Sequence, residues 1–136
     1  AFPRISSVVD AANRYSLLTG FPISLIDLDR ALEGAPGLEI RPGRPGERYA
    51  FNGAGQEIDL EGLLCVARVA GDCVGNAVKD SFATRTSDAT RSVLAVIWAT
   101  TDACTPDVVE RMAAQLADQL RVHGGADATE SAVLRP

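Results

Sequence analysis

The spacing of the apolar residues changes twice along this chain, and that change constrains the fold more than any other feature of the sequence. Residues 7–19 and 105–123 carry apolar side chains at helical spacing, whereas residues 37–99 hold short β-rich runs separated by proline, glycine and asparagine turns. Helices that precede and follow a block of strands, rather than alternating with them, are typical of an α+β domain. The sequence therefore predicts a central, largely antiparallel sheet flanked by helices.

A break at Gly20 and Pro22 divides the N-terminal segment. Ser7 is placed to cap a first helix, which we expect to run as far as the glycine. Ser24 is placed to cap a second, short helix with Asp27 at its third position. The break would then turn the chain between two helices, and we expect Gly20 to adopt the left-handed backbone that ends the first one.

Five β-rich runs occupy the middle of the chain: LEIRPG, RYAF, EIDL, LLCVARVA and SVLAVIWA. The last two are almost uninterrupted apolar sequence, which is expected of central strands covered on both faces. The glycines of FNGAGQE lack the following helix and the lysine of a phosphate-binding loop, so we interpret them as a hairpin turn.

The C-terminal helix has clear signals at both ends. Thr105 is placed as its N-cap, Pro106 occupies the first helical position, and glycines at 124 and 125 end it. Its apolar face, which we expect to pack on the sheet, consists of Val109, Met112, Ala113, Leu116 and Leu120. Residues 126–136 are expected to form a tail that either frays or holds one edge strand.

Length, charge and cysteine content limit the classes of function. A chain of 136 residues is most simply one domain, and its net charge of -5 means that any nucleic-acid contact must come from a local cluster of cations. The three cysteines form no C-x-x-C pair and lie in apolar surroundings, which favours buried thiols and a cytoplasmic location. No apolar run approaches the roughly 20 residues of a membrane span, so no membrane partner is expected.

The chain has one histidine, His123, at the end of the predicted C-terminal helix. There it most simply interacts with the helix dipole and the last carbonyl groups. A Ser-His-Asp or Cys-His nucleophile needs an imidazole within hydrogen-bond reach, and most zinc sites need clustered histidines and cysteines. The sequence therefore predicts no metal and no cofactor.

Polar residues concentrate in NAVKDSFATRTSDATR, residues 76–91, just before an apolar strand. The segment holds the only lysine, two arginines, two aspartates and five hydroxyl groups. Two interpretations stay open: a solvated loop in which Ser87 and Asp88 cap a turn, or the rim of a pocket carried by a rigid scaffold.

Three further segments stand out when taken together: VVDAANRYSLLTGFPISLIDLD, LEGAPGLEIRPGRPGERYAFNG and KDSFATRTSDATRSVLAVIW. In this order they resemble the tRNA-binding editing domain of the phenylalanyl-tRNA synthetase beta subunit and its free-standing relatives. The resemblance spans about residues 3–125, and the positions that follow the family pattern are Val8, Val9, Asp10, Asn13, Gly20, Pro22, Asp27, Asp29, Glu33, Gly34, Arg41, Gly46, Glu47 and Thr90. It implies a single editing-like domain over residues 1–136. Because the synthetase domain starts earlier, it leaves open that an N-terminal helical portion is missing.

In the synthetases this domain hydrolyses tyrosine wrongly attached to the phenylalanine tRNA, with a Thr, a His and a Glu in its pocket. The corresponding positions here hold Ala12, Ser24 and Trp98, or Val96 if the strand is aligned without a gap. Without those side chains, catalysis would depend on positioning water and stabilising an oxyanion. The residues that the resemblance implies for catalysis are Asn13, Ser24, Asp80 and Ser81, and those for substrate binding are Ala12, Thr84, Arg85 and Trp98.

Four cations are expected to contact the tRNA: Arg41, Arg44, Lys79 and Arg91. Two hypotheses follow from the resemblance. One is an aminoacyl-tRNA deacylase that acts in translation quality control by hydrolysing a noncognate aminoacyl ester in trans. The other is a noncatalytic module that binds an amino acid, an aminoacyl-tRNA end or a protein partner. The retained cations favour the first hypothesis, and the three replaced pocket residues favour the second.

Overall fold

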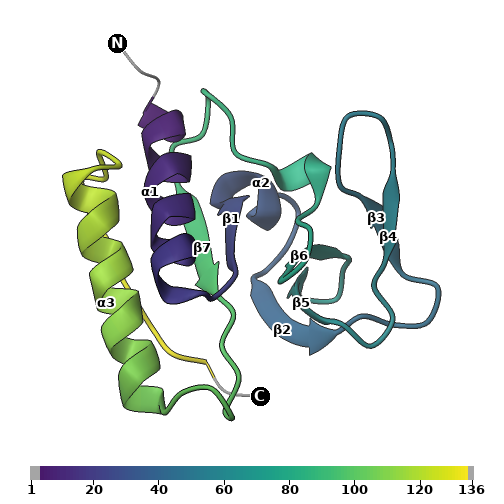
Figure 1. The fold of residues 1–136 in the computed structure, drawn as a ribbon. Coiled ribbons are helices and arrows are strands. Elements are labelled where there is room, and N and C mark those ends of the chain that lie inside the picture. The colour runs from purple at the N-terminus through teal and green to yellow at the C-terminus, as the bar shows by residue number, and fades with distance from the viewer. Residues whose placement is uncertain (1–3, 135–136) are drawn as a thin grey trace. The chain divides into compact units, whose positions relative to one another are not determined.

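The computed structural model describes residues 4–134 and divides them into two compact units (Figure 1). The helical unit contains residues up to 23 and from 96 onward, and the β-rich unit contains residues 24–95. In chain order the elements are α1 (Arg4–Thr19), β1 (Ile23–Asp27), α2 (Leu28–Leu32), β2 (Leu38–Pro42), β3 (Arg48–Ala50), β4 (Glu57–Asp59), β5 (Leu64–Arg68), β6 (Cys73–Asn76), the 3₁₀ helix η1 (Phe82–Thr84), β7 (Val93–Ile97) and α3 (Pro106–Val122). The predicted α+β class is confirmed.

Helices α1 and α3 of the helical unit pack side by side and run antiparallel. The Tyr15 hydroxyl of α1 donates a hydrogen bond of 2.7 Å to Gln115 Oε1 of α3. A second contact lies near the start of α1 and just after the end of α3. There Gly124 is so close to Val8 that a Cβ atom added to the glycine would be 3.3 Å from the valine Cγ2 atom. Two separate contacts therefore hold the helices together.

The glycine stop of α1 and the N-cap of α3 are as the sequence predicts, whereas the predicted cap of α1 at Ser7 is wrong. Helix α1 starts at Arg4, earlier than the predicted cap at Ser7, and ends at Gly20, whose φ is +77° and whose N–H donates 2.8 Å to the Ser16 carbonyl. Helix α3 is capped by Thr105, whose side chain accepts from the Val108 N–H. No strand forms in residues 126–134, so within that described part of the tail the edge-strand alternative is wrong.

The predicted helix cap at Ser24 is wrong. Ser24 lies inside strand β1, where Ser24 and Ile26 are buried at alternate positions. Asp27 caps the short helix α2 instead, and its Oδ1 atom accepts from the Arg30 N–H at 3.0 Å. Alternating burial of a five-residue segment favours a strand over the first turn of a helix.

The strands form three separate sheets in the part of the chain that the structure describes, so the expectation of one central sheet is wrong. Strands β2, β5 and β6 form an antiparallel sheet with β5 in the middle, strands β3 and β4 form an antiparallel hairpin, and β1 pairs with β7. The prediction of a central, covered strand is confirmed for β5, whose residues 65–67 are buried. It is wrong for β7, because every residue of that strand is partly exposed.

One cluster of buried apolar side chains joins the β3–β4 hairpin to the three-stranded sheet, and consists of Tyr49, Leu60, Cys65, Ala67 and Cys73. The glycine-rich turn between β3 and β4 is organised by Asn52, whose Oδ1 atom accepts from the N–H groups of Ala54 and Gln56. The hairpin predicted from FNGAGQE is therefore confirmed. No helix in the described residues is both long and apolar enough for a transmembrane span.

Candidate functional site

Asn76, the last residue of β6, organises the polar segment that follows it. Its side chain is buried; Nδ2 donates 2.7 Å to the Tyr49 hydroxyl, and Oδ1 accepts from the N–H groups of Val78 and Lys79 at 2.7 and 3.0 Å. The Tyr49 hydroxyl in turn donates to the Lys79 carbonyl. These bonds fix the turn that leads from the sheet to Lys79 and Asp80.

The Asp80 carboxyl group lies against the buried end of this turn. Its Oδ1 atom is buried and has no hydrogen-bond partner among the described residues. Burial raises the pKa of Asp80, while hydrogen bonds from the Ser24 hydroxyl and from the backbone of Asn76 and Leu25 act in the opposite direction. A carboxyl group with a raised pKa is a stronger base than an ordinary aspartate and can accept and return a proton during a reaction.

The approach of Asp80 to the sheet depends on a glycine. A Cβ atom added to Gly75 of β6 would lie 2.8 Å from Asp80 Oδ1 and 2.8 Å from the Cδ1 atom of Ile26. Any larger residue at this position would therefore displace the carboxyl group or the isoleucine.

Ser24 connects Asp80 to Asn76. The Ser24 hydroxyl is buried and donates 3.0 Å to the Asn76 carbonyl, and it also forms a hydrogen bond with the Asp80 carboxyl group. Because a hydroxyl carries a single hydrogen, it can donate to Asn76 while accepting from a neutral Asp80, or turn to donate to an ionised one. The pair can thus follow a change in the protonation of Asp80.

Ser81 and Thr84, also predicted as site residues, support the loop from inside. The Ser81 side chain caps η1 by accepting from the Ala83 N–H at 3.3 Å. Thr84 is 1% exposed and donates 3.4 Å to the Val74 carbonyl. Both hydroxyls have structural partners, so we assign these residues to positioning the loop.

Two exposed cations of the segment rest on aromatic rings. The Lys79 ammonium lies 5.0 Å from the centre of the Phe51 ring, and the Arg85 guanidinium lies 3.6 Å from the centre of the Phe82 ring. Arg85 Nη1 also donates 2.9 Å to the Phe82 carbonyl. We call these four residues the cation-aromatic surface, since both cations are held in place while remaining open to solvent.

The other predicted tRNA-binding cations differ in their surroundings. The Arg41 side chain is 12% exposed and forms a two-pronged pair with Glu47, at 2.9 and 2.7 Å, which holds the pKa of that carboxyl group at about 2. It also donates to the Gly71 carbonyl at 2.9 Å, so we assign Arg41 to the scaffold. Arg44 and Arg91 are exposed.

Ala12, Asn13 and Trp98 belong to the helical unit, whereas Ser24 and Asp80 are brought together in the β-rich unit. Ala12 is 2% exposed on α1, and the next residue, Asn13, is exposed. Trp98 is partly buried, and its backbone N–H donates 3.0 Å to the Pro22 carbonyl.

Sequence reasoning missed the roles of Asn76, Tyr49 and Gly75. The position of Asn76 at the start of the polar segment was a usable signal, because asparagine commonly accepts hydrogen bonds from the backbone two residues ahead. Nothing in the local sequence signals the contact with Tyr49, which is 27 residues away.

Comparison of the chain with models of protein families, with curated proteins and with solved structures finds no match. In the part of the chain that the structure describes, no three His, Cys, Asp or Glu side chains gather in a way that could hold a metal ion. The candidate site therefore consists of Asp80 and Ser24, and three of the four residues of the cation-aromatic surface, Lys79, Phe82 and Arg85, belong to the same segment as Asp80.

Proposed function

We propose that the chain binds the aminoacylated end of a tRNA and hydrolyses a noncognate aminoacyl ester. The single observation that carries the proposal is the Asp80 carboxyl group next to Ser24, whose Oδ1 atom is buried without a hydrogen-bond partner. The sequence resemblance to an editing domain supplies the substrate class, since a carboxyl group of this kind serves many hydrolytic reactions.

Asp80 would act as the general base. Its carboxylate takes a proton from a water molecule, the resulting hydroxide attacks the carbonyl carbon of the ester, and a tetrahedral oxyanion forms. As that intermediate collapses, the ribose oxygen leaves and takes the proton back from Asp80, which yields free amino acid and tRNA. Ser24 would turn its hydroxyl to stabilise Asp80 in each protonation state.

The cation-aromatic surface supports the binding step. Lys79 and Arg85 flank the Asp80 position in sequence and are preorganised by Phe51 and Phe82, so less side-chain freedom is lost when they contact phosphates. Aromatic and guanidinium planes also stack on unpaired bases, which the single-stranded end of a tRNA provides. Arg44 and Arg91 would extend the contact.

The experiment measures release of amino acid from a panel of mischarged tRNAs. We expect Asp80→Asn to lower the rate by about 10²–10⁴-fold, as is typical for the loss of a general base. Asp88→Asn is the matched control, because Asp88 lies exposed in the same segment. Equal rates for the two variants would contradict the role of Asp80.

The binding step is tested separately by tRNA affinity at several salt concentrations. Binding should be modest and should fall steeply with salt, and Lys79→Glu should weaken it further. If the affinity for tRNA changes neither with the salt concentration nor in the Lys79→Glu variant, the result would contradict specific tRNA binding and favour a protein partner. Binding without hydrolysis of any ester would favour the noncatalytic module.

A further inference from the structure

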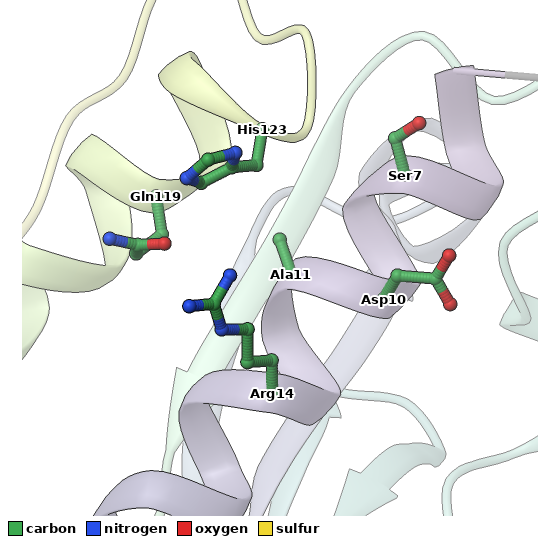
Figure 2. A pocket seen from close by; sticks show the side chains of 6 residues that line it. All are labelled: Ser7, Asp10, Ala11, Arg14, Gln119 and His123. Carbon is green, nitrogen blue, oxygen red and sulfur yellow. The ribbon is translucent and has the colours of Figure 1, made fainter.

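A pocket of about 200 Å³ lies between α1 and α3 of the helical unit, and the proposed deacylase does not use it. Its lining residues are Ser7, Asp10, Ala11, Arg14, Gln119 and His123 (Figure 2). At about 30 Å³ for each water molecule, it has room for several waters or for one small polar ligand.

The two helices also contact each other near this pocket. Val8 lies close to Gly124, and the Tyr15 hydroxyl donates a hydrogen bond to Gln115. Among the α1 residues that line the pocket, Ala11 has a small, buried side chain, which leaves space between the helices. The hollow is thus set by the packing of α1 and α3.

Most of the polar groups around the pocket can donate hydrogen bonds. Figure 2 shows the side chains of Arg14, Gln119 and His123 around one space over Ala11, while the carboxylate of Asp10, which also lines the pocket, points away from these three side chains. Arg14 is exposed and forms no ion pair or hydrogen bond with any side chain that the structure describes. An arginine that forms no direct ion pair with a described side chain therefore lines the pocket.

We infer that this pocket binds a phosphate group. The Arg14 guanidinium and an N–H of the His123 imidazole provide donors for several oxygens of one oxyanion, and the guanidinium fork matches two phosphate oxygens at once. The volume suits a phosphate group with a small attached residue rather than a large ligand. The inference is independent of the proposed deacylase activity, because the residues involved belong to the helical unit.

The test is a titration of the full chain with inorganic phosphate and with glycerol phosphate, a phosphate monoester, at constant ionic strength. Nuclear magnetic resonance of the Gln119 amide and the His123 ring should show saturable shifts. Tighter binding of the monoester would identify an esterified phosphate as the ligand, and equal binding would identify free phosphate. The absence of saturable shifts with both compounds would overturn the inference.

Two variants and a control complete the test. Arg14→Gln should weaken phosphate binding by about tenfold or more, since a charged hydrogen-bond donor is lost. Ala11→Leu should abolish it by filling the space between the helices. Arg111→Gln, which removes an exposed arginine of α3 that does not line the pocket, should leave binding unchanged. Equal weakening by Arg14→Gln and Arg111→Gln would mean that only general charge attraction is involved and would overturn the inference.

Circular dichroism of each variant confirms that the helices are intact.

Discussion

The side-chain amide of Asn76 donates a hydrogen bond of 2.7 Å to the hydroxyl of Tyr49, and this bond joins the end of β6 to the β3–β4 hairpin. Both groups are buried or nearly so, and both also bond to the turn at Val78 and Lys79. The loop that carries Asp80 is therefore anchored to two sheets by one asparagine and one tyrosine.

Replacing Asn76 by alanine should destabilise the protein substantially. The substitution leaves the N–H groups of Val78 and Lys79 without their acceptor, so we expect a loss of about 2–4 kcal/mol in the free energy of unfolding. Urea unfolding measures it. Asn13→Ala, an exposed asparagine on α1, should change stability by less than about 0.5 kcal/mol. A similar, small effect of both substitutions would contradict the anchoring role.

Gly75→Ala should displace the Asp80 carboxyl group without altering the residue itself. The new methyl group would lie 2.8 Å from both Asp80 Oδ1 and Ile26 Cδ1, so one of them must move. We expect a loss of about 1–3 kcal/mol in stability, together with a lower rate of ester hydrolysis. In the control Gly53→Ala, the nearest atom of Phe82 is 3.5 Å from the added Cβ, an ordinary contact, and little change is expected. Normal stability and rate in the Gly75 variant would contradict the close approach of Asp80.

Asp80→Asn should become more stable than the wild type as the pH rises. The pKa of Asp80 is raised in the folded state, so the folded protein binds its proton more tightly than the unfolded chain does. Stability is therefore lost as the pH rises from the ordinary aspartate value of 3.8 through the raised folded value, and the amide cannot show this loss. Melting temperatures between pH 4 and pH 8 test the prediction. If the melting temperatures of the two proteins change in parallel with pH, the pKa of Asp80 is not raised in the folded state.

Glu47 should give the opposite pH dependence. Hydrogen bonds from Arg41 hold the pKa of Glu47 at about 2 in the folded state, against an ordinary value of 4.5. Its contribution, about 3 kcal/mol, is fully present above pH 4.5 and is lost as the pH falls toward 2. Glu47→Gln should remove this part of the acid sensitivity, whereas Glu57→Gln, at a side chain 53% exposed, should not. Unfolding free energies measured from pH 2 to pH 6 distinguish the two variants.

Gly20→Val should destabilise the end of α1 through backbone strain alone. Gly20 has a φ of +77°, and an added Cβ meets no atom within 4 Å, so no clash contributes. A β-branched residue in this left-handed conformation should cost about 1–2 kcal/mol, and Gly20→Asn should cost less because asparagine tolerates it. Thermal unfolding of the two variants provides the comparison. An unchanged melting temperature for Gly20→Val would contradict the strain.

Much of the local structure follows from the sequence by itself. The Thr105 cap of α3, the glycine stop of α1, the hairpin at FNGAGQE and the buried run of β5 all depend on neighbours a few residues away, such as Thr105 with Val108 or Asn52 with Gln56. Local hydrogen bonds and the spacing of apolar residues depend only on residues that are close together in the sequence. They can therefore be predicted without knowledge of the fold.

The tertiary structure decided which polar residues act together. Ser24 had the local pattern of a helix cap, yet the burial of Ser24 and Ile26 made it part of a strand, 52 residues from its partner Asn76. Arg41 resembled an exposed cation until its pairing with Glu47 made it part of the scaffold. The raised pKa of Asp80 and the pocket over Ala11 likewise depend on groups distant in the sequence, because burial and packing are properties of the folded chain and not of any single segment.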